Sequence, residues 1–123
     1  KGLKVLCIDN DAHILEGMEA LLENWQCQTL TALSLDDART VLDGEPPDII
    51  LADYQLDDDR NGLDAMDALR EDFDQAIPGV LITGYLGEEA RDDATARGYH
   101  VLYKPVKPAA LRALVNKLIK KRP

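Results

Sequence analysis

Pro47-Asp48-Ile49-Ile50-Leu51-Ala52-Asp53-Tyr54 is the stretch that decides the fold of this chain. After a proline that opposes helix, it runs through apolar residues and reaches a carboxylate. A short run this apolar is typical of a strand buried on both faces, as in the centre of a parallel sheet. Pro46 before it and Asp57-Asp58-Asp59 after it oppose regular structure. Asp53 is therefore predicted to end a central strand, at the sheet edge where open α/β proteins place ligands.

Five strand-like segments alternate with five helical segments along the chain, joined by short connections. This alternation predicts a three-layer α/β domain with a parallel sheet. The expected strands are 3–8, 26–32, the run within 47–54 that reaches Asp53, 80–83 and 99–103. The expected helices are 12–25, one that Ser34 caps with help from Asp37, one that Gly62 opens, 88–97, and one that begins at Pro108.

The chain has 123 residues, which is enough for one hydrophobic core, so we expect residues 1–123 to form a single domain. It begins at Lys1 rather than Met, which suggests excision from a longer protein that could itself be membrane-tethered. No apolar run approaches the roughly 20 residues of a membrane span, so no membrane insertion is expected. Cys7 and Cys27 lie in apolar runs without disulfide or metal spacing, which favours free thiols and a cytoplasmic location.

The charge of the chain is −9 and is unevenly distributed. All 23 acidic residues and 6 of the 14 basic residues lie in 1–93, whereas 94–123 holds 8 basic residues and no acid. An acidic body opposes binding to nucleic acid, so no nucleic-acid partner is expected. The basic run from Lys117 to Arg122 is interpreted as cations at a helix C-terminus, where the helix dipole favours them.

Polar residues stand at the ends of four expected strands, and parallel pairing brings those ends to one rim. They are Asp9-Asn10-Asp11, Asp53, Thr83 and Lys104. Clustered carboxylates favour a cation such as Mg²⁺, which prefers hard oxygen ligands. One carboxylate can attack a phosphoryl group, and a hydroxyl and an ammonium can hold its equatorial oxygens. Each residue alone has a plainer reading: Asp53 or Asp11 as a cap, Thr83 as a strand end, and Lys104 as a surface lysine.

With these residues in place, the chain resembles the receiver domain of two-component response regulators over essentially its whole length. Two motifs make the chain most similar to the C-terminal receivers of hybrid sensor histidine kinases. They are Leu6-Cys7-Ile8-Asp9-Asn10-Asp11 and, near the end, Lys104-Pro105-Val106-Lys107-Pro108. The resemblance implies a flavodoxin-like (βα)5 sandwich with strand order 2-1-3-4-5, an order known for a chemotaxis receiver.

The resemblance also assigns roles to residues. It implies phosphorylation of Asp53 and a Mg²⁺ cofactor. The implied metal ligands are Asp9, Asn10, Asp53 and the backbone carbonyl of Gln55, with Asp11 as a further candidate. Thr83 and Lys104 are the implied phosphate-binding and switch residues, and the bond before Pro105 is implied to be cis.

Three features depart from the family pattern. Asn10 replaces the second acid of the pair, which weakens attraction for a divalent ion by roughly 1–4 kcal/mol if the lost charge lay about 4 Å away. The loop from Asp53 to Gly62 is one residue longer than usual and lacks the customary proline. The switch aromatic is replaced by Val101, so Tyr99 or Tyr103, on the same strand face by alternation, becomes the candidate for that role.

The leading hypothesis is a phosphoacceptor that receives its phosphoryl group from a histidine kinase or a histidine phosphotransfer domain and then changes its partner preference. Such a domain catalyses only its own aspartyl phosphorylation and dephosphorylation, although the parent chain could be a sensor kinase. A homodimer through the face of the fourth and fifth helices is a further expectation.

Two alternatives stay open. A degenerate receiver would act as an interaction module without phosphorylation, as Asn10, Val101 and the lengthened loop after Asp53 suggest. A remote alternative is a haloacid-dehalogenase-like phosphatase, whose nucleophile motif Asp9-x-Asp11 imitates. That family also needs a late acidic motif for Mg²⁺, and nothing after Asp93 is acidic.

Overall fold

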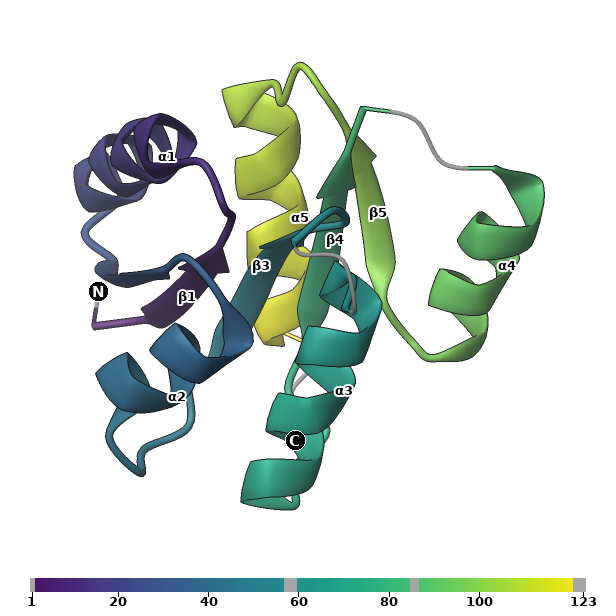
Figure 1. Cartoon of the computed structure of the whole chain (residues 1–123). Helices are drawn as coiled ribbons and strands as arrows, with labels where there is room; N and C mark the ends of the chain where they lie inside the picture. The colour runs from purple at the N-terminus through teal and green to yellow at the C-terminus, as the bar shows by residue number, and fades with distance from the viewer. Residues whose placement is uncertain (1, 57–59, 85–86, 121–123) are drawn as a thin grey trace.

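The computed structural model describes residues 2–56, 60–84 and 87–120. Its centre is one parallel sheet of five strands in the order β2-β1-β3-β4-β5, which confirms the predicted fold (Figure 1). The strands are β1 (Lys4–Ile8), β2 (Gln28–Ala32), β3 (Ile49–Asp53), β4 (Gly79–Thr83) and β5 (His100–Tyr103).

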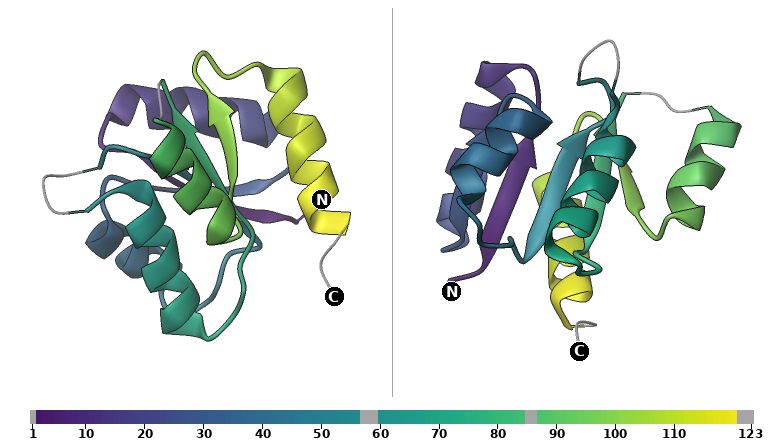
Figure 2. Two further views of the ribbon diagram at one scale, coloured as in Figure 1. Left: turned by 90° about the vertical axis from the view of Figure 1, so that its right-hand side faces the viewer. Right: turned by 60° about the horizontal axis from the view of Figure 1, so that its bottom comes forward.

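Helices cover both faces of the sheet (Figures 1 and 2). They are α1 (Ala12–Asn24), α2 (Leu35–Leu42), α3 (Gly62–Phe73), α4 (Glu88–Ala96) and α5 (Pro108–Lys120). One apolar cluster joins the sheet to α1 and α5, and a second joins it to α2, α3 and α4. No helix among the described residues is long and apolar enough to cross a membrane.

Strand β3 is the centre of the sheet, and all five of its residues are buried. Ile50 and Ala52 face the cluster beneath α2 and α3, whereas Ile49 and Leu51 face the cluster beneath α1 and α5. This alternation explains the unbroken apolar run, because side chains on both faces of the strand enter a core.

Local capping follows the sequence closely. The hydroxyl of Ser34 accepts the N–H of Asp37 at 3.1 Å, and the carboxylate of Asp37 accepts the N–H of Leu33 at 2.8 Å. The side chain of Asn61 caps α3 by accepting the N–H of Asp64. The bonds to Ser34 and Asn61 satisfy N–H groups that a helix start leaves without intrahelical partners, and the bond from Leu33 ties the preceding residue to the first turn.

Several predicted strands and helices are one or two residues longer than the observed elements. The second strand begins at Gln28 rather than residue 26, because Gln26 has a φ of 65° and turns the chain. The fifth begins at His100 rather than Tyr99, and α1 and α4 end one residue early. The predicted structure breaker 57–59 and the end of the basic tail at 121–122 lie outside the described residues.

Gly62 fixes the start of α3 against the end of β3. Its N–H donates to the carbonyl of Tyr54 at 2.8 Å. A Cβ at this position would collide with the backbone carbonyl oxygen of Asp53 and lie 2.9 Å from Cδ1 of Leu81. The absence of a side chain therefore lets α3 begin directly beside the strand end that carries Asp53.

We expect Gly62→Ala to lower the free energy of unfolding by about 1–3 kcal/mol, because backbone atoms must shift to admit the methyl group. Gly17→Ala is the matched control. Gly17 lies inside α1 with open space around it, so alanine should stabilise the protein by about 1 kcal/mol through helix propensity. Chemical denaturation measures both changes, and equal effects at the two glycines would contradict this account of Gly62.

Candidate functional site

The carboxyl ends of the paired strands form one rim. Ile8 is in register with Ala52, Asp53 with Ile82, and Thr83 with Tyr103. The residues at or just after these ends therefore gather at one edge of the sheet, as the sequence predicted.

Asp53 and Lys104 form an ion pair at the centre of the rim. The Lys104 Nζ lies 2.8 Å from Oδ1 of Asp53, whose side chain is 10% exposed. The hydrogen bond to Asp53 is the main reason that the pKa of Lys104 is raised. The Lys104 N–H donates to the carbonyl of Thr83 at 2.8 Å, and the Lys104–Pro105 bond is cis. Asp53 therefore has a cationic partner at the rim.

Asp9 follows β1 and is buried, with 6% of its surface exposed. Burial raises the pKa of its carboxyl group, and the negative charge of Asp53 adds to the rise, whereas the N–H of Asp11, donating to Oδ1 at 2.9 Å, opposes it. Asp9 forms no ion pair with any residue that the structure describes. The rim thus carries two buried carboxylates close enough to interact and one ammonium.

Asn10 has a structural role that the sequence did not indicate. Its amide Nδ2 donates to the carbonyl of Leu56 at 2.9 Å, which ties the loop after β1 to the loop after β3 across 46 residues. An aspartate could not make this bond, because an ionised carboxylate has no donor. The substitution that departs from the family pattern therefore supplies a contact between the two loops that border Asp53.

The other predicted site residues lie around this centre. Asp11 caps α1 by accepting the N–H of His13 at 2.9 Å, which is the plainer role considered for it. Gln55 is exposed and pairs with Asn61 in an isolated antiparallel bridge. Thr83 ends β4 and is only 5% exposed.

The two candidate switch aromatics have opposite environments. Tyr99 is 3% exposed, its hydroxyl donates to Asp67 at 2.6 Å, and the guanidinium of Arg70 lies 4.1 Å from the centre of its ring. Burial and the Asp67 contact raise the pKa of Tyr99 above its ordinary range. Tyr103, at the end of β5, is 42% exposed. Only Tyr103 therefore has room to change its side-chain conformation without breaking core packing.

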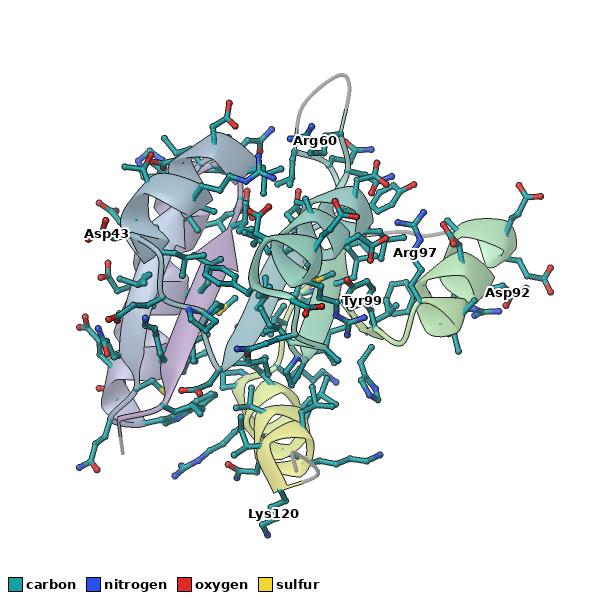
Figure 3. The ribbon with its side chains drawn as sticks, turned by 90° about the horizontal axis from the view of Figure 1, so that it is seen from below. Asp43, Arg60, Asp92, Arg97, Tyr99 and Lys120 are labelled. Carbon is teal, nitrogen blue, oxygen red and sulfur yellow. The ribbon has the colours of Figure 1, made fainter. Side chains whose placement is uncertain are left out.

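Arg97 is the centre of a charged cluster that sequence reasoning missed. Its guanidinium contacts Asp64 and Asp67 of α3 at 3.3 and 2.9 Å and Asp93 of α4 at 2.8 Å. Figure 3 shows Arg97 beside Tyr99, where α3 and α4 approach each other. The hydrogen bond to Asp93 and its acidic neighbours raise the pKa of Arg97 above its ordinary range. The only signal in the sequence was the i, i+4 spacing from Asp93.

The donor set at the rim fits a magnesium ion. Mg²⁺ in proteins is held by one or two carboxylates with other oxygen ligands and water. Asp9 and Asp53 supply two carboxylates, while Asn10 and the Gln55 carbonyl could supply neutral oxygens. Within the described residues, no three acidic, histidine or cysteine side chains form a metal-binding group, so a metal here would depend on these neutral ligands. The raised pKa of Asp9 marks a carboxylate that a cation would stabilise.

The fold and the rim define a flavodoxin-like domain with an acidic site at the carboxyl ends of its strands. A family model described as the response regulator receiver domain matches residues 5–116. The chain therefore belongs to the response regulator receiver family, which supports the phosphoacceptor hypothesis over the haloacid-dehalogenase-like alternative.

Two curated relatives are regulators by their names, and one of them is named as a response regulator. Response regulator protein PilR of Pseudomonas aeruginosa is 32% identical over 120 residues, and phyllosphere-induced regulator PhyR of Methylorubrum extorquens is 25% identical over 118 residues. The matches cover 97% and 94% of this chain but only 26% of PilR and 43% of PhyR. The chain thus spans less than half the length of either relative.

Solved structures agree on the fold. The receiver domain of NtrX from Brucella abortus has a TM-score of 0.84 at 22% identity, and the alignment covers 96% of this chain and 99% of that one. Chemotaxis protein CheY4 of Vibrio cholerae has a TM-score of 0.83 at 21% identity, with the same coverage. Receiver domains in general bind Mg²⁺ at an acidic pocket and interact with histidine kinases or phosphotransfer proteins.

The raised pKa of Asp9 predicts how stability depends on pH. The folded protein binds a proton at Asp9 more tightly than the unfolded chain does, so the free energy of unfolding falls as pH rises from about 3.9 through the raised pKa. Above that pH range, the ionised carboxylate of Asp9 is an electrostatic penalty that keeps the free energy of unfolding low. Asp9→Asn removes it, and we expect a gain on the order of 1 kcal/mol at neutral pH without metal.

The measurement is chemical denaturation of both proteins at several pH values, in the presence of a chelator. The difference between them should shrink as the solution becomes acidic, because Asp9 is then neutral in the original protein. Asp92→Asn, an exposed residue on α4, serves as the control for removing one acidic charge from a chain of net charge −9. A loss of stability in Asp9→Asn at neutral pH would show that Asp9 is not electrostatically strained.

Proposed function

We propose that Asp53 is the phosphoacceptor of a two-component phosphorelay and receives its phosphoryl group from a histidine kinase or a histidine phosphotransfer domain. The observation that carries this proposal is the Asp53–Lys104 pair of 2.8 Å beside buried Asp9. A carboxylate held at a rim beside a counter-cation is suited to nucleophilic attack on phosphorus. Residues 1–123 act as one receiver domain.

The transfer requires no proton from the acceptor. An oxygen of Asp53 attacks the phosphorus of the phosphohistidine, a phosphorus–oxygen bond forms, and the phosphorus–nitrogen bond breaks with its electron pair on the imidazole. Lys104 then pairs with the new phosphoryl oxygens, and the hydroxyl of Thr83 donates to another. Asp9, Asn10, Asp53 and the Gln55 carbonyl would hold Mg²⁺, which offsets negative charge on the transferred group when bound.

Phosphorylation of Asp53 at the end of β3 changes the contacts of Thr83 and Lys104 at the ends of β4 and β5, and we propose that the face of α4, β5 and α5 changes its partner preference in response. The strand pairing of Thr83 with Tyr103 makes Tyr103 the better candidate for the switch aromatic, because Tyr99 is enclosed. The same face carries acidic residues on α4 and Lys117 and Lys120 on α5, which suits a homodimer. Such a switch is a population shift driven by the differential contacts of the phosphate.

Intact-mass spectrometry after incubation with acetyl phosphate and Mg²⁺ tests the phosphoacceptor directly. We expect one phosphate adduct on the original protein, because Asp53 is the buried carboxylate that Lys104 contacts. Asp53→Asn and a sample with chelator should both lack the adduct. An adduct that persists in Asp53→Asn would place the acceptor elsewhere.

A stronger version of the same experiment replaces acetyl phosphate with a cognate histidine kinase or phosphotransfer domain as the phosphoryl donor. Failure to transfer from such a donor, with the protein folded and Mg²⁺ present, would favour the alternative of an interaction module that works without phosphorylation. Partner binding that is equal for the original protein and Asp53→Asn would support that alternative.

Asn10→Asp separates the metal role of Asn10 from its structural role. The added charge should tighten Mg²⁺ binding about tenfold, because a unit charge near a divalent ion contributes at least about 1 kcal/mol. The same change removes the bond from Asn10 to Leu56 and adds a third carboxylate, so the metal-free protein should lose about 1 kcal/mol of stability. Calorimetric Mg²⁺ titration and denaturation with chelator measure the two effects.

Asn10→Ser is the matched control, because serine is neutral and short. It should lose stability without gaining affinity for Mg²⁺. Unchanged Mg²⁺ affinity in Asn10→Asp would mean that residue 10 does not face the ion.

A further inference from the structure

A cavity of about 260 Å³ lies beside Asp53 on the side of the sheet that α1 and α5 cover. Leu51 and Ile82 line it from the sheet, Ile14 and Met18 line it from α1, and Val106 lines it from the loop before α5. All five are apolar, so this part of the pocket, which opens to solvent beside Ile14, offers an apolar surface next to the rim. The phosphoryl chemistry proposed above uses none of these side chains.

The size of this cavity suits an organic group. An apolar cavity of about 150 Å³ stays dry and can bind benzene. The larger cavity here therefore has room for an aromatic ring with a short chain. Ligand sites in proteins are typically apolar concavities with a few convergent polar groups, and this cavity has that composition.

The polar groups at its end are Asp9, Asp53 and Lys104. Lys104 is already paired with Asp53 and its charge also acts on Asp9 at longer range, but no cation among the described residues forms an ion pair with Asp9. Two carboxylates and one ammonium leave one negative charge, and the half-exposed Asp11 adds another nearby. The mouth therefore attracts a cation and repels an anion.

We propose that this cavity binds organic cations with an apolar body, with the ammonium at Asp9 and Asp53 and an aromatic ring against Leu51, Ile82 and Met18. Such a ligand places its charge on the same two carboxylates that would hold Mg²⁺. It therefore competes with Mg²⁺ and slows phosphorylation of Asp53. Binding itself does not depend on the proposed function, so the two ideas can fail separately.

Three matched probes test the chemistry by calorimetric titration without Mg²⁺. Phenylpropylammonium has the ring and the cation, propylammonium lacks the ring, and phenylbutyrate has the ring with an anionic head. We expect phenylpropylammonium to bind at least about tenfold more tightly than either, from burial of the ring and from the sign of its charge. Equal affinity for the ammonium and the carboxylate, or no gain from the ring, would overturn the proposal.

Variants locate the binding site. Ile14 is 38% exposed and lines the cavity, so Ile14→Trp can fill its entrance with little effect on folding, and Val106→Phe fills it from the facing loop. Either should weaken phenylpropylammonium binding at least about tenfold. Leu33→Trp is the control, since Leu33 is 48% exposed and lies outside this cavity. Tight binding that survives both filling variants would place the ligand elsewhere.

Competition completes the test. Added Mg²⁺ should raise the apparent dissociation constant of phenylpropylammonium, and Asp9→Asn should weaken its binding about tenfold. The same ligand should slow the formation of the phosphate adduct on the original protein. Binding without any adduct, either from acetyl phosphate or from a cognate histidine kinase or phosphotransfer domain, would retain the cavity site and reject the phosphoacceptor. An adduct whose rate is insensitive to a ligand that binds would show that the ligand does not reach the two carboxylates.

Discussion

The parallel pairing of β1, β3 and β4 with their carboxyl ends in register is the constraint on which the site depends. It brings Asp9 and Asp53 to one edge although 44 positions separate them in the chain. The two apolar cores that grip β3 from opposite faces hold Asp53 at that edge, because moving the strand would take Ile50 or Leu51 out of its core. The packing of the hydrophobic layers therefore holds the like-charged carboxylates of Asp9 and Asp53 close together.

The Asp53–Lys104 pair contributes little to that stability in itself. Removing a carboxylate and an ammonium from water costs much of what their attraction returns, so a partly buried pair is weak evidence for a stabilising role. Its value is chemical, because an ammonium near 2.8 Å can follow the negative charge when it moves from carboxylate to phosphate. Asp9 forms no ion pair in the described structure and interacts with Lys104 only at longer range, so the two carboxylates and one ammonium leave the rim with a net negative charge.

The sequence predicted what depends on local pattern and missed what depends on contacts between distant residues. The strands, their order, the caps at Ser34 and Asp11, and the gathering of Thr83 and Lys104 follow from periodicity and the family resemblance. The bond from Asn10 to Leu56 and the Arg97 cluster join segments that no period relates. The cavity was equally hidden, because it is a space between α1 and the sheet and leaves no mark on either segment alone.

The packing of α4 limits how a change at the rim can reach the outer face. Ala94 is the only buried residue of this helix, so Arg97 and its contacts with α3 contribute much of its attachment. Tyr99 cannot change its side-chain rotamer, because Asp67, Arg70 and the close backbone of Gly79 surround its ring. The direct connection is instead the β4–β5 pair, where Thr83 stands opposite Tyr103 and accepts the N–H of Lys104 through its carbonyl. A rearrangement of Thr83 and Lys104 therefore acts first on the exposed end of β5, and α4 follows only if the ionic contacts of Arg97 yield.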